Sequence, residues 1–177
     1  MAKDVVPNLV VVADASPLIA LAAIDRLALL PALLGSVKVV QSVYNEVMTG
    51  AFDPTETRIA QAFANTWLEL VPDAVPVFDM MEPLAVADWV HLDPGEAASI
   101  SFALLAPRQH AVLIDEQAGR KVCQVLGLQY IGTAALIGQA KQKGLVPSAK
   151  AELARLHATG FWISAQVIRT VLARVGE

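Results

Sequence analysis

The chain has 177 residues, enough for one domain with a sizeable core, and carries a net charge of −4. Hydrophobic residues make up 55% of it, which predicts that some apolar surface is buried against a partner, and we expect a homodimer. The single cysteine, Cys123, excludes an internal disulfide and is typical of a reducing compartment, so we expect a cytoplasmic protein.

The N-terminal half of the chain alternates strand and helix patterns. An apolar strand covers 9–13, and Ser16 then caps a helix with Pro17 in its first turn. The next elements are a helix at 26–34 that stops at Gly35, a strand at 37–41, helices at 42–48 and 54–65, and a strand at 67–71. The segment 72–90 is interrupted by prolines and predicts a loop with a short helix.

The C-terminal half continues the alternation. Asp93 opens a helix that runs to about residue 105, and an apolar strand at 110–115 ends on Asp115. The later elements are a helix at 116–126, a strand at 128–133, and helices at 133–143, 148–158 and 163–175. This alternation predicts an α/β protein with a parallel sheet covered by helices on both faces, in a single domain over residues 1–177.

Charge is spread unevenly along the chain. From residue 141 onward there are six Lys or Arg against two Asp or Glu, whereas the rest holds seven against fifteen. The basic residues of this helical end are Lys141, Lys143, Lys150, Arg155, Arg169 and Arg174. They could follow a phosphate backbone, although Lys141 and Lys143 could instead complement the dipole at the end of a helix.

The longest uncharged segment, 122–140, is long enough to be considered as a membrane span. It contains three glutamines and three glycines, together with the patterns of a strand and a helix start. We therefore interpret it as the interior of an α/β protein and expect no membrane association. The first residues lack a basic stretch followed by an apolar one, so we also expect no signal peptide.

Two apolar strands lead directly into an aspartate, Asp14 after 9–13 and Asp115 after 110–114. Ligands of open parallel sheets bind beyond the carboxyl ends of the strands, so these carboxylates converge if their strands are neighbours. Carboxylates that converge repel each other and require protons or cations. Because no histidine or cysteine pattern accompanies them, the oxygen ligands favour Mg²⁺ or Mn²⁺.

Two glutamates extend this acidic set. Glu46 lies one turn into the helix at 42–48, and Glu96 lies in the first turn of the helix that Asp93 opens. An acidic cluster with one or two divalent ions suits phosphodiester hydrolysis, since the metal activates water and neutralises charge on the attacked phosphate.

Each acidic residue could also have a purely structural role, and the sequence leaves these roles open. Asp93 and Glu96 match a capping box. Asp14 could begin a turn, and Ser16 could be an N-cap. Glu46 could be a solvated helix carboxylate, and Asp115 could cap the helix that follows it.

Several segments resemble the PIN-domain family, in order and over nearly the whole chain. They read "VVADASPLIAL", "SVYNEV", "LDPGEAASISFAL", "VLIDEQAGRKVCQVLGLQYIGTAALI" and "AKQKGLV", and they are most similar to a prokaryotic branch of the family. The resemblance implies a three-layer α/β/α fold with a central parallel sheet. It also implies a metal-dependent ribonuclease that uses Mg²⁺ or Mn²⁺, such as the toxin of a toxin–antitoxin pair.

The resemblance assigns the family's four acidic positions to Asp14, Glu46, Glu96 and Asp115, with Ser16 at the neighbouring hydroxyl position. The family often has aspartate at the third position, where this chain has the longer Glu96. Two further residues are supporting candidates, Glu116 after the fourth acidic position and Thr133 in the "GT" after the last strand.

From these residues we expect a ribonuclease in which the four carboxylates hold the metal and Ser16 orients a carboxylate or a water. The expected partners are RNA and an antitoxin-like protein. The alternative is a catalytically inactive PIN-like protein that binds a protein partner or RNA; the glutamate at the third position and the acidic body favour it.

Overall fold

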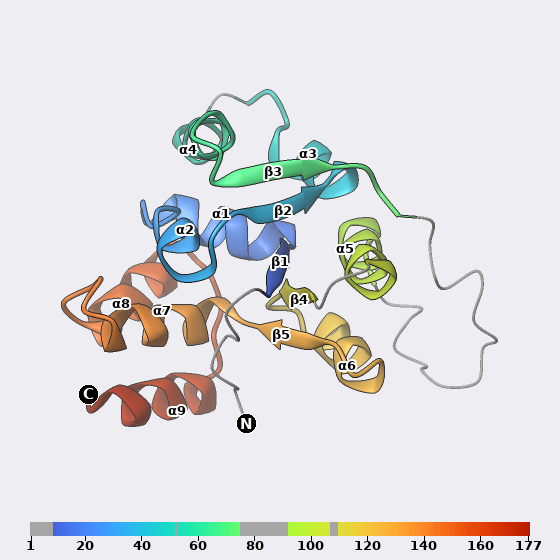
Figure 1. Cartoon of the computed structure of the whole chain (residues 1–177). Helices are drawn as coiled ribbons and strands as arrows, with labels where there is room; N and C mark the ends of the chain where they lie inside the picture. Colours follow the sequence, from blue (N-terminus) through green and yellow to red (C-terminus); the bar gives the residue numbers. More distant parts are fainter. Residues whose placement is uncertain (1–8, 52, 75–91, 107–109) are drawn as a thin grey trace.

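A parallel sheet of five strands forms the centre of the molecule, in the order β3-β2-β1-β4-β5 (Figure 1). The structure is a computed structural model that describes residues 9–51, 53–74, 92–106 and 110–177. The strands are β1 (Val10–Ala13), β2 (Val37–Val40), β3 (Leu68–Val71), β4 (His110–Leu113) and β5 (Gln129–Ile131). All five predicted strands are therefore present, each ending within two residues of its predicted end, and every described pair is parallel.

The described residues contain nine helices. They are α1 (Ala15–Ala23), α2 (Leu29–Leu34), α3 (Gln41–Val47), α4 (Pro54–Ala64), α5 (Pro94–Leu105), α6 (Gln117–Val125), α7 (Thr133–Gln142), α8 (Ala149–Ala158) and α9 (Ala165–Val175). No helix in this described part of the chain is both long enough and apolar enough to cross a membrane. The predicted short helix within 72–90 falls mostly on residues 75–91, which lie outside the described residues.

Three predicted helix starts are off by two or three residues, those of α1, α2 and α9, and the last begins at Ala165 rather than at residue 163. Helix α2 begins at Leu29 rather than at residue 26, because Asp25 has a left-handed backbone (φ 57°) and 26–28 form a turn after it. Helix α1 begins two residues earlier than predicted, so Ser16 lies inside the helix and is not its N-cap. The N-cap is Asp14, whose backbone is extended (φ −79°, ψ 167°), because its N–H still donates to the carbonyl of Leu113 in the sheet (3.0 Å).

Helices cover both faces of the sheet. Helix α5 contacts β1, β2 and β4, and α6 contacts α5 and β5, whereas α7 contacts α1 and α2 on the opposite side (Figure 1). The side chains between these layers are fully buried, among them Ile100 of α5, Val122 of α6, Leu18 of α1 and Leu136 of α7. This arrangement confirms the predicted α/β/α layers and the parallel sheet with helices on both faces.

The C-terminal helices α8 and α9 pack beside α7, away from α5 and α6 (Figure 1). They enclose a second apolar cluster that includes Ile137, Leu153, Leu156 and Val171. Helix α8 is fastened to the turn after α1 by Glu152, which bonds Arg26 and Arg155 at 2.8 Å each. The helical C-terminal end thus contributes a core of its own beside the sheet.

Strands β1 and β4 are neighbours, with Val12 opposite Val112 in the ladder. The chain runs outward from β1 to β2 and β3, and later crosses to the other side of β1 to form β4 and β5. Beyond the strands, Ile114 N–H donates to the carbonyl of Ile131 at 2.8 Å. The carboxyl ends of β1, β4 and β5 therefore meet at one edge of the sheet, at the point where the strand order reverses, which is where such sheets bind ligands.

Candidate metal centre

Asp14 stands at the end of β1 as the N-cap of α1, and its side chain is only 2% exposed. Its Oδ1 is buried and has no hydrogen-bond partner among the described residues. Burial raises its pKa from 3.8 to about 7, although the N–H of Ala15 acts in the opposite direction. The negative charges of Asp93, Glu96 and Glu46 raise it further, so these four carboxyl groups are close enough to interact.

Glu96 forms a capping box with Asp93 at the start of α5. Its N–H donates to Asp93 Oδ1 (2.8 Å), and its Oε2 accepts from the N–H of Asp93 (3.2 Å). The structural role that the sequence offered is thus correct, but it uses only one carboxylate oxygen. The second, Oε1, is buried and has no partner in the described structure. Burial raises the pKa of Glu96 to about 7, and the charges of Asp93, Glu116 and Glu46 add to this.

Glu46 lies on α3 and is largely exposed. Its pKa is raised first by the partial desolvation of its carboxylate and second by the negative charge of Asp93. A glycine brings its helix close to α5. A Cβ placed at Gly95 would lie 3.1 Å from Glu46 Oε2 and 3.3 Å from Asp93 Oδ1. The start of α3 is held by Asp73, beyond the end of β3, which accepts from the N–H and the hydroxyl of Ser42 (2.9 and 2.7 Å). The packing of α3 against α5 therefore places Glu46 near Asp93 and Glu96.

Asp115 follows β4 and is bound to Thr133 and Arg120. Its Oδ1 accepts from Arg120 Nη2 (2.8 Å) and from the N–H of Thr133 (3.0 Å), and its Oδ2 accepts from the Thr133 hydroxyl (2.5 Å). Burial raises the pKa of Asp115, whereas Thr133 and Arg120 act to lower it. Asp115 is not the cap of α6, whose N-cap is Glu116, so that structural alternative is wrong.

The supporting candidates have different surroundings. Thr133 is fully buried at the start of α7 and holds Asp115 through two donors. Glu116 is exposed, and its negative charge raises the pKa of Glu96. Ser16 is half-buried in the first turn of α1, two residues after Asp14.

A family model described as PIN domain matches residues 10–177. The chain belongs to the PIN-domain family. PIN domains are generally nucleases that act on RNA and use a divalent metal, so the chain carries the fold of a hydrolase of nucleic acid. No significant match was found among curated proteins or among solved structures.

The acidic residues of this PIN domain fall into two groups. Asp14, Glu46 and Glu96 interact with one another and with Asp93, whereas Asp115 is bound to Arg120 and Thr133. In the described stretches, no three Asp, Glu, His or Cys side chains are arranged as a ready-made metal cage. The sequence left open whether the strands before Asp14 and Asp115 are neighbours, and the structure shows that β1 and β4 pair. The sequence did not predict that Asp115 is already bonded to Arg120.

Two atoms of the first group fit a divalent cation. Asp14 Oδ1 and Glu96 Oε1 are buried oxygens without a protein partner in the described part, and a buried unpaired carboxylate is unstable unless it is protonated or bound to a cation. Oxygen donors of this kind suit Mg²⁺ or Mn²⁺. Asp14 and Glu96 are therefore the residues best placed to hold the ion that the family uses.

Three features of the site were missed by the sequence reasoning. Asp93 was interpreted only as a helix cap, yet its charge raises the pKa of Asp14, Glu46 and Glu96. The sequence did contain a signal for this role, because Asp93 lies only three residues before the candidate ligand Glu96. The role of Arg120 depends on a contact that sequence spacing does not reveal.

The third feature is Gly119 in α6. Atoms of Ile114 and Glu96 occupy the space that a side chain at this position would need. A Cβ there would lie 2.2 Å from Ile114 Cδ1 and 2.8 Å from Glu96 Oε1. A distance below 3 Å would force the neighbours to move, so glycine at this position lets α6 approach the buried carboxylate of α5.

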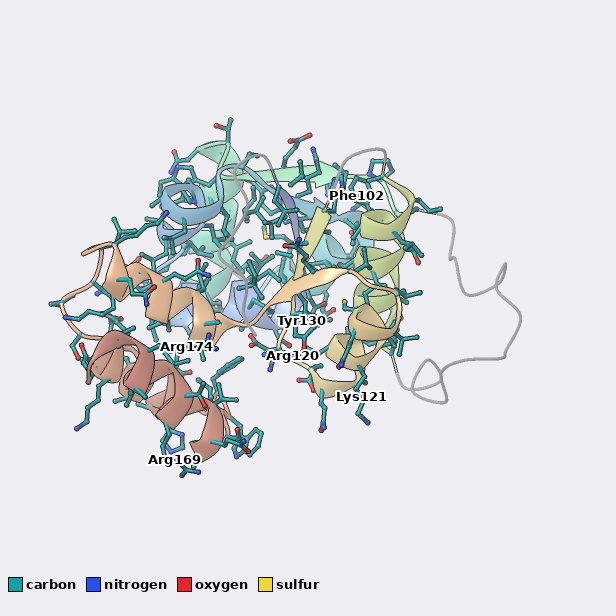
Figure 2. All side chains as sticks on the ribbon, turned by 60° about the horizontal axis from the view of Figure 1, so that its bottom comes forward. Phe102, Arg120, Lys121, Tyr130, Arg169 and Arg174 are labelled. Atoms are coloured by element: carbon teal, nitrogen blue, oxygen red, sulfur yellow. The ribbon has the colours of Figure 1, made fainter. Side chains whose placement is uncertain are left out.

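Some basic residues of the C-terminal end form hydrogen bonds and ion pairs within the protein. Lys141 Nζ donates to the carbonyl of Pro147 (2.7 Å) and pairs with Glu177 (3.4 Å), and Arg155 bonds Glu152 and the carbonyl of Ile24. Of the cations that could follow a phosphate backbone, Arg169 is exposed on the outer helix α9 (Figure 2).

Proposed function

We propose that this PIN domain is a divalent-metal-dependent ribonuclease that hydrolyses RNA phosphodiester bonds. The observation that carries the proposal is the pair of buried, unpartnered carboxylate oxygens of Asp14 and Glu96. They lie at the edge of the sheet where the strand order reverses, in a family whose members generally use a divalent metal.

In this proposal each acidic residue has its own task. Asp14 and Glu96 hold Mg²⁺ or Mn²⁺ directly, and Glu46, exposed on α3, adds negative charge to the group. Asp115 is the fourth acidic residue and is kept in a fixed orientation by Thr133. A bound ion would supply charge neutralisation at the attacked phosphate and activation of the attacking water. Ser16 orients a carboxylate or a water beside Asp14.

The proposal is tested by calorimetric titration with Mn²⁺ and by cleavage of a labelled RNA with Mn²⁺ or with EDTA. We expect saturable Mn²⁺ binding by the wild-type chain, and loss of both binding and cleavage in Asp14→Asn and Glu96→Gln. The matched control is Glu69→Gln, because Glu69 is an exposed carboxylate on the edge strand β3 that pairs only with Lys38 in the described structure. Cleavage that persists in Asp14→Asn, or in EDTA, would contradict the proposal.

A second candidate function is a PIN-like protein that binds RNA or a protein partner without cutting. The observation that favours it is the ion pair of Asp115 with Arg120, together with the lack of a ready-made cage among the described side chains. A wild-type chain that binds RNA in a filter assay yet binds no Mn²⁺ would support this function over the first.

As a ribonuclease, the chain would suit the role of a toxin whose antitoxin-like partner covers apolar surface or blocks the acidic site. Exposed apolar side chains such as Leu105, Val125 and Trp162 are compatible with such a partner, or with a homodimer. We propose the toxin role on this basis, and a cytoplasmic location because the chain has a single cysteine. Copurification from the native cell tests it: a small protein at equal stoichiometry supports the toxin role, and its consistent absence argues against it.

A further inference from the structure

Asp115 already has a cation beside it. Arg120 Nη2 lies 2.8 Å from Asp115 Oδ1, and the side chains of the pair are 28% and 12% exposed. A largely buried pair of this kind is electrostatically strong, because little water screens it. The negative charge of Asp115 is thus compensated by the protein itself.

The guanidinium of Arg120 is held in place from several sides. Its Nε donates to the carbonyl of Ile114 at 2.9 Å, in the segment that leads from β4 to Asp115. Its far end lies against Gly132, where a Cβ would stand 2.3 Å from Nη2 and 3.1 Å from Cζ. Gly132 has an ordinary backbone (φ −103°), so its missing side chain is needed for space and not for backbone conformation.

Helix α6 touches both acidic groups through two consecutive residues. Gly119 lies against Glu96 Oε1 of the first group, and the next residue, Arg120, bonds Asp115 of the second. Figure 2 labels Arg120 near α6, well separated from Arg169 on α9. A second divalent ion bridging the two groups would have to stand next to Asp115, where the guanidinium already lies.

We propose that Arg120 is a built-in cation that takes the place of a second metal ion beside Asp115, so that this chain binds a single divalent ion. The inference rests on the proposed function, because it assumes that Asp14 and Glu96 hold the first ion. Arg120 is a positioning residue in this scheme: it neutralises Asp115 and keeps a fixed positive charge where a mobile ion would otherwise bind.

The test counts ions. Mn²⁺ stoichiometry is measured by calorimetry, and ion positions are obtained from anomalous scattering of crystals soaked in MnCl₂. We expect one ion in the wild-type chain and two in Arg120→Gln, the additional one next to Asp115. The control Arg169→Gln removes an exposed arginine on α9 and should retain one ion.

A second variant leaves the arginine in the chain. Gly132→Ala places a methyl group 2.3 Å from the present position of Arg120 Nη2 and 3.1 Å from Asp115 Oδ1, so the guanidinium must leave its place beside Gly132. We expect two ions here as well, with weaker binding of the second than in Arg120→Gln because the positive charge stays nearby. Circular dichroism verifies that both variants are folded.

The outcomes separate the two proposals. Two ions in the wild-type chain, or a single ion in both folded variants, would overturn the inference about Arg120 while leaving the ribonuclease proposal intact. No Mn²⁺ binding by the wild-type chain would overturn both, since no first ion would then exist.

Discussion

The carboxyl groups of Asp14 and Glu96 are buried in the folded protein and become hydrated when the chain unfolds. Each is about 2% exposed, and for each the desolvation of the charged form is the largest cause of a raised pKa. Their protonation therefore couples the stability of the metal-free protein to pH.

The stability of the metal-free protein should fall as the pH rises from about 4 to about 7. In that range Asp14 and Glu96 keep their protons in the folded state but lose them in the unfolded chain, so the folded state binds more protons. For Asp14, a shift in pKa from 3.8 to about 7 corresponds to about 4 kcal/mol. Urea unfolding in EDTA at pH 4 and pH 8 measures the difference.

Substitution identifies the groups that cause this pH dependence. Asp14→Asn should reduce it strongly, because the amide does not titrate. Glu69→Gln should leave it unchanged, since Glu69 is exposed on the edge strand and stays hydrated in the folded protein. An equal pH dependence in Asp14→Asn and wild type would show that other groups are responsible.

Among the helices, α3 is held at its N-terminal end by Asp73, which lies beyond the end of β3. The carboxylate of Asp73 accepts two hydrogen bonds from Ser42, in the first turn of the helix that carries Glu46. Asp73 thereby accepts a hydrogen bond from a free N–H at the start of α3, as an N-cap side chain does in other helices.

We predict that Asp73→Ala lowers the free energy of unfolding by about 1 kcal/mol and weakens Mn²⁺ binding severalfold. The control is Asp53→Ala, because Asp53 caps α4 by accepting from the N–H of Glu56 (2.8 Å) and that helix carries no candidate ligand. Asp53→Ala should cost similar stability and leave Mn²⁺ affinity unchanged. An equal loss of affinity in both variants would mean that α3 has no special role.

Helix α8 is attached to the rest of the fold through Glu152. This glutamate is 3% exposed and is bonded by both Arg26 and Arg155, and Arg155 also reaches the carbonyl of Ile24. Breaking a buried charge network on one side leaves its partners uncompensated, so Glu152→Ala should lower stability by about 3 kcal/mol. In Glu69→Ala, which breaks the exposed pair with Lys38, the loss should stay below about 1 kcal/mol. Urea unfolding of both variants gives the comparison, and similar losses would contradict it.

For the whole molecule, the proposed ion joins elements that are far apart in the sequence, because Asp14 caps α1 and Glu96 begins α5. Ion binding should therefore stabilise the entire fold. At a free Mn²⁺ concentration of about 100 times Kd, the gain is about 2.7 kcal/mol. For a chain of this size that corresponds to a rise in Tm of about 5–10 °C.

Thermal unfolding with Mn²⁺ and with EDTA tests this expectation. The rise in Tm should be larger at pH 8 than at pH 5, because the ligands bind metal only when deprotonated. It should vanish in Asp14→Asn and persist in Glu69→Gln. An undiminished rise in Asp14→Asn would place the ion elsewhere in the molecule.

The sequence by itself determined the architecture. Short apolar runs such as 9–13 and 110–114 are buried on both sides, so they form strands between helical layers and need no detailed contacts to be recognised. The capping box of Asp93 and Glu96 was also readable, because its two hydrogen bonds join residues three positions apart. The family resemblance likewise agreed with the match over residues 10–177.

Only the tertiary structure decided how the acidic residues are distributed. Asp115 meets Thr133 across the edge of the sheet, and α6 turns Arg120 back onto it, while Asp73 reaches α3 from the next strand. These contacts depend on which strands become neighbours and on how closely helices approach at Gly119 and Gly132. Local sequence patterns carry no information on such distances, because they are set by the packing of whole layers against one another.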